Sequence, residues 1–200
     1  MSIILTSGLN FKNTQMQTYK EDQGINFGTW NDSISRFLYQ DSTEQILNKI
    51  NIPNLVADYG GANGNLKQFI PQSVSIDIDK TKNPDINDNI LTHSKYYDLV
   101  IIRYVLHYLN DYEVLQLFKT IKAKNILVIQ FENNDLKSKY FNSQNEFKYF
   151  RTSQQLKQLL PKQAEEIYLK TYELGKEFYT NRLGKGEYKT HSEILKAYYI

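Results

Sequence analysis

Cysteine is absent from this chain of 200 residues. Its absence excludes disulfide bonds, a thiolate nucleophile and any cysteine-ligated metal centre. Disulfides accumulate in oxidising compartments, so a chain without cysteine favours the interior of the cell. We therefore expect a cytoplasmic protein.

Long hydrophobic runs are missing as well. The apolar stretches are only a few residues long, far short of the roughly 20 that a membrane-spanning helix needs. The first residues, MSIILTSGLNFKN, carry neither the basic segment nor the apolar core of a secretion signal. We expect no membrane segment and no membrane partner.

Histidine and net charge are both sparse. The three histidines, His93, His107 and His191, form no pair at helical spacing, so we predict no metal site. The net charge of +2 gives no argument for nucleic-acid binding, although the last third of the chain is net positive. That excess of basic residues fits an anionic substrate, but it fits a solvated face better.

Apolar strand patterns and helical patterns alternate after residue 53. NLVADY, SVSIDI, YDLVII and NILVIQF read as buried strands, and NDYEVLQLFKTI reads as an amphipathic helix capped by Asn110. Near the end, EEIYLKTYEL and EILKAYYI read as the two strands of an antiparallel hairpin. The pattern predicts an α/β fold with a doubly wound, mostly parallel sheet and this hairpin at one edge.

The first fifty residues are expected to be a polar arm followed by helices. In GTWNDSISRFLYQ, apolar residues recur at helical spacing, and STEQILNKI begins with a capping pattern, Ser42-x-x-Gln45. We assign residues 1–50 to an arm and helices that belong to the same domain as the core of residues 51–200. The arm either folds over a pocket or is a flexible leader.

Three of the nine glycines fall within five positions, in the segment LVADYGGANGNL. The segment follows the first strand, where glycines let backbone N–H groups approach a ligand. Its spacing is neither G-x-G-x-x-G nor that of a phosphate-binding P-loop. By itself the segment is either a ligand loop or a plain turn.

Acidic residues follow at the ends of later segments. SVSIDID ends with Asp77 and Asp79, and PDINDNIL contains Asp85 and Asp88. In a doubly wound sheet, a carboxylate at the end of the second strand faces the ligand crevice and accepts from ribose hydroxyls. The apolar strand in YDLVIIRYVLHYLND comes next, so the features occur in the order that one crevice would present them.

Together these segments resemble the class I S-adenosylmethionine-dependent methyltransferases, in their branch that acts on small molecules. VADYGGANG is similar to the first motif of that family, an acid followed by G-x-G-x-G. SIDID is similar to its ribose-binding segment, and DINDNIL to the segment that touches adenine. YVLHYLND is similar to a V-L-H-H-L-x-D sequence of the small-molecule branch. The resemblance covers residues 54–131 closely and implies a Rossmann-like methyltransferase fold.

The resemblance also implies site residues. Asp58 would orient the methionine amino group, and glycines of the loop would let the backbone approach the methionine. Asp77 would bind the ribose hydroxyls, Asp88 would accept from the adenine amino group, and Asn89 would offer its backbone N–H to the ring. Arg103 would lie near the cofactor carboxylate or the substrate. The full set implied for S-adenosyl-L-methionine is Asp58, Gly60, Gly61, Gly64, Asp77, Ile78, Asp88, Asn89 and Arg103.

Two departures from the family pattern stand out. Ala62 replaces the middle glycine, which is tolerable if its φ stays negative. The interval between Gly64 and Asp77 is short, so the first helix should be very brief.

The resemblance places candidate catalytic residues after the strand YDLVII. His107 could act as a general base, because its pKa lies near neutrality, or it could pack on the cofactor or cap a helix. Arg103 and Tyr104 are further candidates for catalysis, and Tyr19, Trp30 and Tyr108 are candidates for the substrate pocket.

The expected function is methyl transfer to an oxygen or nitrogen of a small molecule or peptide by in-line displacement. The position that carries Asn/Asp-Pro-Pro-Tyr/Phe in amino methyltransferases reads IRYVL here, which argues against methylation of adenine N6, cytosine N4 or glutamine. A tRNA or other RNA methyltransferase is a less favoured alternative. A non-catalytic partner subunit with the same fold is another. The sequence leaves the acceptor and the oligomeric state open.

Overall fold

The computed structural model describes residues 42–132, 149, 151–174 and 191–200. The expected arm and the predicted Trp30 helix therefore lie outside the described residues, as do Tyr19 and Trp30 themselves. Residues 42–47 are helical and include Ser42, so the start of that helix falls at the edge of the described part. No helix in the described ranges is long and apolar enough to cross a membrane.

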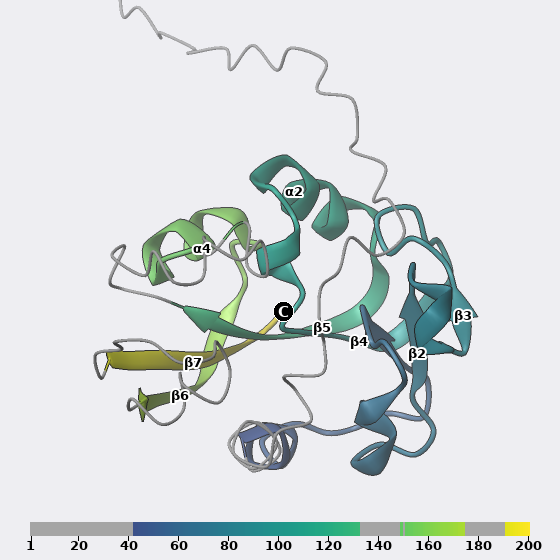
Figure 1. The fold of residues 1–200 in the computed structure, drawn as a ribbon, viewed down its shortest axis with the longest axis horizontal. Coiled ribbons are helices and arrows are strands. Elements are labelled where there is room, and N and C mark those ends of the chain that lie inside the picture. Colours follow the sequence, from purple (N-terminus) through teal and green to yellow (C-terminus); the bar gives the residue numbers. More distant parts are fainter. Residues whose placement is uncertain (1–41, 133–148, 150, 175–190) are drawn as a thin grey trace, which may run out of the picture.

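The described residues form one mixed sheet in the order β3-β2-β1-β4-β5-β7-β6 (Figure 1). Strands β1 to β5 pair in parallel, and β7 lies antiparallel between β5 and β6. The seven strands are β1 Val56–Tyr59, β2 Val74–Asp77, β3 Ile86–Asn87, β4 Tyr96–Arg103, β5 Lys122–Glu132, β6 Glu165–Leu174 and β7 His191–Tyr199. The mostly parallel sheet and the edge hairpin are both confirmed.

Helices cover the sheet on both faces. On one face, α2 (Asp111–Thr120) and α4 (Ser153–Leu159) pack Val114, Leu117 and Leu156 into an apolar core. On the other face, the helix of residues 42–47 and the 3₁₀ turn η2 (Asn65–Gln68) bury a second core. Figure 1 shows α2 and α4 on one side of the sheet and the helix of residues 42–47 on the other.

Local sequence explains where several elements begin. Asn110 and Glu113 form a reciprocal capping box at the start of α2, as the sequence predicts. Thr152 and Gln155 form the same device at the start of α4. The short interval after Gly64 yields only the 3₁₀ turn η2 where a longer helix would otherwise lie. The expectation of a very brief first helix is thus confirmed.

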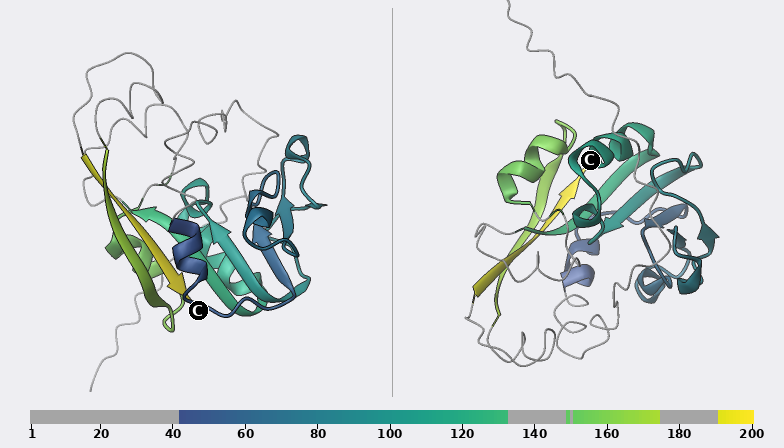
Figure 2. Two further views of the ribbon diagram at one scale, coloured as in Figure 1. Left: turned by 90° about the horizontal axis from the view of Figure 1, so that it is seen from below. Right: turned by 45° about the horizontal axis from the view of Figure 1, so that its top comes forward.

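The burial of β1 and of the middle of β4 explains why these segments are almost entirely apolar. All four residues of β1 are buried, because parallel neighbours lie on both of its edges and helices on both of its faces. In Figure 2 the hairpin of β6 and β7 forms one edge of the sheet, and the β2–β3 side forms the other. One residue breaks the apolar rule on β1, namely Asp58.

Candidate functional site

The glycine loop leaves the carboxyl end of β1 and crosses to β2. The N–H of Gly60 donates to the carbonyl of Ile76 at 2.8 Å, which ties the loop to the neighbouring strand. Gly60 has φ +68° and Gly64 has φ +74°, both in the left-handed region that favours glycine. The loop therefore holds a fixed shape at the edge where β1, β2 and β4 end.

Close neighbouring atoms leave no room for a side chain at Gly60 or Gly61. A Cβ at Gly60 would lie 2.5 Å from Cγ2 of Val105, a residue of the loop after β4. A Cβ at Gly61 would lie 2.9 Å from Oδ2 of Asp58, closer than real Cβ atoms approach, so the close contact with Asp58 requires glycine here. Part of the glycine requirement therefore comes from the packing of the protein itself.

Asp58 carries a buried carboxylate without hydrogen bonds. It is 1 % exposed, and neither of its oxygens has a hydrogen-bond partner in the described part of the chain. Its nearest countercharge is Nη2 of Arg103, 3.5 Å from Oδ2, which is long for a charge-assisted hydrogen bond. Burial raises the pKa of the Asp58 carboxyl, Arg103 opposes that rise, and Asp77 adds to it. A buried carboxylate in this state is well suited to receive a cationic group of a ligand.

Asp77 ends β2 and organises the glycine loop. Its Oδ2 accepts from the N–H of Ala62 at 2.9 Å, and its Oδ1 accepts from the N–H of Asp79 at 2.9 Å. The carboxylate lies where the resemblance implies a ribose-binding acid. Each oxygen keeps a further acceptor position for a ligand hydroxyl.

Ala62 departs from the conformation expected for it. Its φ is +45°, so the alanine adopts the left-handed conformation and the condition of a negative φ is not met. The hydrogen bond from its N–H to Asp77 accompanies this conformation.

Replacing Ala62 by glycine should stabilise the protein. The left-handed conformation costs a non-glycine residue about 1–2 kcal/mol, and the larger unfolded-state entropy of glycine offsets part of the gain. We expect Ala62→Gly to raise the free energy of unfolding by about 0.5–1 kcal/mol, measured by denaturant titration. Asn83, with φ +51° at the end of η3 (Lys80–Lys82), is a matched control. Asparagine tolerates this region, so Asn83→Gly should gain less; an equal gain at both positions would contradict the argument.

Asp88 and Asn89 follow β3, beside the end of β2. The N–H of Asp88 donates to the carbonyl of Asp77 at 3.1 Å. The N–H of Asn89, predicted to face the adenine ring, donates instead to Oδ1 of Asp88 at 2.8 Å. Ile78 is exposed at this point, so an aliphatic side chain and a carboxylate lie at the same edge.

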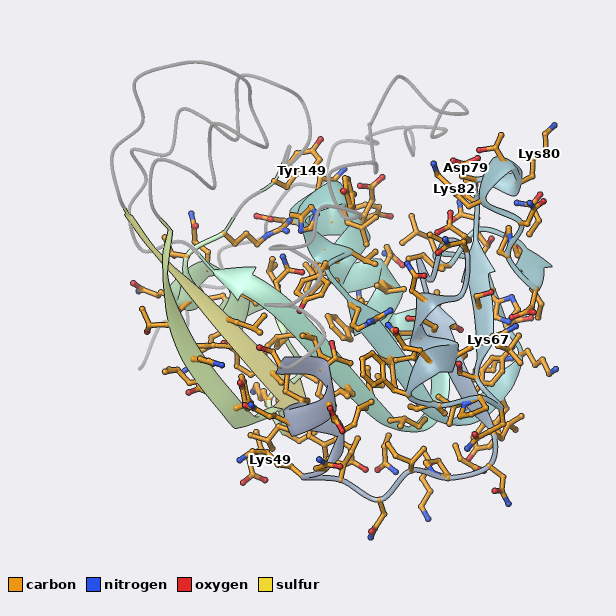
Figure 3. All side chains as sticks on the ribbon, turned by 60° about the horizontal axis from the view of Figure 1, so that its bottom comes forward. Lys49, Lys67, Asp79, Lys80, Lys82 and Tyr149 are labelled. Atoms are coloured by element: carbon orange, nitrogen blue, oxygen red, sulfur yellow. The ribbon has the colours of Figure 1, made fainter. Side chains whose placement is uncertain are left out.

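Figure 3 shows how this end of the molecule is arranged. Asp79, Lys80 and Lys82 lie together in the loop after β2, at the same end as Tyr149 and opposite to Lys49. Tyr149 lies beside the segment that follows β4, since its N–H donates to the carbonyl of His107 at 2.9 Å. The loops after β2 and β4 therefore share one end of the sheet.

Of the predicted catalytic residues, Arg103 is the last residue of β4, and Tyr104 and His107 lie in the segment that follows it. Tyr104 is buried and has φ +56°, an uncommon conformation for a bulky residue and one that is enriched at functional sites. His107 lies on the 3₁₀ turn η4 (Leu106–Tyr108) and is 1 % exposed. Its Nδ1 lies 2.9 Å from Nε2 of Gln130, and its ring packs against Tyr108. Gln130 is a buried residue of β5 that the sequence argument missed.

Arg151 is a second residue that the sequence argument missed. Its guanidinium donates to the carbonyls of Leu106 and Leu109, each at 2.7 Å, and to that of Tyr149 at 3.1 Å. It also donates to Oδ1 of Asp111 from Nε and Nη2. Arg151 thus holds η4, the start of α2 and residue 149 together. These partners lie some forty residues earlier in the chain, so no local motif announces the contact.

No protein-family model matches this chain, and no curated protein matches it in sequence. Solved structures do match its fold. A SAM-dependent methyltransferase from Archaeoglobus fulgidus aligns with a TM-score of 0.55 and 14% identity, covering 82% of this chain and 94% of its own. The magnesium protoporphyrin IX methyltransferase ChlM from Synechocystis PCC 6803, with bound SAH, aligns with a TM-score of 0.54 and 16% identity over 88% and 89% of the two chains.

A third solved structure, the N-methyltransferase NodS from Bradyrhizobium japonicum WM9 in complex with S-adenosyl-L-homocysteine, aligns with a TM-score of 0.55 and 13% identity. The alignment covers 86% of this chain and 90% of NodS. This chain therefore has the Rossmann-like fold of the class I SAM-dependent methyltransferases. At these identities the likeness establishes the fold, and the function has to be argued from the residues of the site.

Proposed function

We propose that this chain is an S-adenosylmethionine-dependent methyltransferase that methylates an oxygen or nitrogen of a small molecule or peptide. The observation that carries the proposal is the buried Asp58 carboxylate, which has no hydrogen-bond partner in the described residues and lies beside a glycine loop at the end of β1. A buried carboxylate in this state is costly for the protein alone. It becomes favourable when a ligand ammonium binds beside it as a counterion.

The residues around Asp58 fit the rest of the cofactor. Asp58 and Arg103 offer opposite charges 3.5 Å apart, which complement an amino acid with both its amino and carboxylate groups charged. The Nε of Arg103 is buried and has no hydrogen-bond partner in the described ranges, so it is available for a carboxylate. Asp77 lies at the position from which ribose hydroxyls would be bound, and the exposed Ile78 offers an apolar surface for a purine.

S-adenosylmethionine would supply a methyl group on a sulfonium, which is already a good electrophile. The protein then has to bind, align and exclude water, and it has to accept a proton only where the acceptor requires it. In this proposal His107 forms part of the pocket wall. With the Gln130 amide donating to Nδ1, the neutral ring carries its proton on Nε2, and neither nitrogen is a free acceptor. Tyr104 and Tyr108 are the candidates beside the acceptor.

Calorimetric titration tests this function. We expect S-adenosylmethionine and S-adenosylhomocysteine each to bind one site, and adenosine to bind more weakly because it lacks the amino acid that Asp58 and Arg103 complement. NADH is the control for a general dinucleotide crevice and should not bind. If both methionine-derived ligands fail to bind, the enzyme proposal is wrong and a non-catalytic subunit becomes the better reading.

A further inference from the structure

His93 belongs to the segment between β3 and β4, and its side chain joins that segment to the core. Its ring is 7 % exposed. Nδ1 lies 2.7 Å from Oδ2 of Asp88, and Nε2 lies 3.2 Å from the hydroxyl of Tyr97, a fully buried residue of β4. The imidazole thus connects Asp88, just after β3, to a central strand of the sheet.

The chemistry of Asp88 and Tyr97 determines which ring nitrogen of His93 carries the proton. An ionised carboxylate can only accept, so Nδ1 of His93 carries a proton and donates to Asp88. In the neutral ring, Nε2 then accepts from the Tyr97 hydroxyl. The hydrogen bond from His93 is the main reason why the pKa of Asp88 lies below its usual range. Asp88 is therefore held as an anion, a pure hydrogen-bond acceptor.

Aromatic packing prevents the imidazole from turning. Tyr97 stacks against it with ring centroids 5.9 Å apart and planes inclined by 25°. Tyr59, from β1, meets its edge at 5.8 Å with planes inclined by 88°. Because both tyrosines belong to central strands, the direction of the Nδ1–H bond is fixed by the most rigid part of the fold.

The opposite side of the Asp88 carboxylate remains accessible. The side chain is 43% exposed, and it lies next to the end of β2, where its own N–H donates to the carbonyl of Asp77. Oδ2 is bound by His93, and Oδ1 is bound by the N–H of Asn89. Each oxygen keeps one acceptor position, and the exposed Ile78 offers an apolar surface nearby.

We propose that His93 is a positioning residue that fixes the Asp88 carboxylate as the acceptor for the exocyclic 6-amino group of adenine. This inference rests on the proposed function, because it assumes that the cofactor lies along the ends of β1, β2 and β3. It adds a source of selectivity: a purine without the 6-amino group leaves the anion without a ligand partner. A histidine that only anchored the loop would leave the affinity ratio of the two purines unchanged.

The experiment compares the affinity of S-adenosylhomocysteine with that of its analogue in which hydrogen replaces the 6-amino group. For the wild-type protein we expect the amino form to bind roughly tenfold or more tightly, as for a hydrogen bond to a charged group. His93→Phe keeps an aromatic ring on Tyr97 but removes the donor, and should reduce the ratio to about threefold or less. His93→Asn places an amide donor near the former Nδ1 and should restore most of the ratio.

Each outcome decides a separate point. A wild-type ratio near one, or an undiminished ratio in His93→Phe, overturns this inference and leaves the proposed function standing. Failure of the wild-type protein to bind S-adenosylhomocysteine at all overturns the proposed function as well.

A measurement on the unmodified protein covers the case in which His93→Phe fails to fold. Nitrogen-15 NMR of the histidine rings should show His93 with its proton on Nδ1. That proton signal should shift when S-adenosylhomocysteine binds, and much less with the analogue. A ring protonated only on Nε2, or equal shifts with both ligands, would contradict the role of His93.

Discussion

Replacing Asp58 by asparagine should separate cofactor binding from stability. Among the described residues, the buried carboxylate has only the ion pair with Arg103 at 3.5 Å to compensate its desolvation, so a neutral amide of the same shape removes a cost in the free protein. The same change removes the counterion for the methionine ammonium, an interaction of about 1.5–3 kcal/mol. We expect Asp58→Asn to weaken binding of S-adenosylhomocysteine by about tenfold to a hundredfold in calorimetry, with the free energy of unfolding unchanged or higher.

Asp79→Asn is the matched control for this variant. Asp79 lies at the same end of the sheet, and its carboxylate accepts from Thr81 as the N-cap of η3. Asparagine is an equally good N-cap, so this variant should keep both stability and affinity. If Asp58→Asn binds the ligand as tightly as the wild-type protein does, the carboxylate is not the receptor of the ammonium.

The wild-type protein and Asp58→Asn should differ in their pH dependence, because the pKa of Asp58 is raised. A carboxyl whose folded-state pKa is raised favours the folded state when protonated, and this contribution is lost as the pH rises through the folded-state pKa. The stability advantage of Asp58→Asn should therefore be present above that pKa and vanish below the unfolded value. Ligand affinity has the opposite trend, because the ammonium needs the ionised form. Wild-type affinity should fall as the pH decreases through this pKa, and that of Asp58→Asn should not.

Features that depend on neighbouring residues could be predicted from the sequence. The alternation of apolar strands and amphipathic helices led to the mostly parallel sheet, and the capping box at Asn110 and Glu113 is present as expected. The glycines of the loop also follow the first strand directly, as their sequence context indicates, and Gly60 and Gly64 adopt the positive φ that glycine permits. Local sequence preferences and the overall fold agree here, which is why the local patterns predict the fold.

Features that depend on contacts between distant residues could not be predicted. The strand β3 has only two residues, and it exists because Asn87 and Ile86 pair with β2. The positive φ of Ala62 is imposed by the loop in spite of the alanine side chain. Even at short range, no sequence pattern indicates that His93 approaches Tyr97 with one ring nitrogen and Asp88 with the other.

Arg151 makes the largest such contact, and its replacement should destabilise the protein more than any other change considered. Its guanidinium is buried and donates to the carbonyls of Leu106 and Leu109; the Leu106 carbonyl also accepts from the N–H of Leu109 at 3.3 Å. Arg151→Met keeps the length and the apolar stem but removes every donor. Losing two buried hydrogen bonds from a charged donor, each worth about 1.5–3 kcal/mol, predicts a loss of about 3 kcal/mol in the free energy of unfolding. Denaturant titration measures this loss directly.

Asp111, the exposed ion-pair partner of Arg151, provides the control. The Asp111 side chain is 74% exposed, so its ion pair with Arg151 is screened by water and contributes little. Asp111→Asn should therefore cost less than about 1 kcal/mol, even though it removes the negative charge paired with Arg151. A similar loss in both variants would mean that the ion pair stabilises this region and the carbonyl contacts do not. A large loss in Arg151→Met alone would show that the segment carrying His107 is held by hydrogen bonds from the Arg151 side chain to backbone carbonyls.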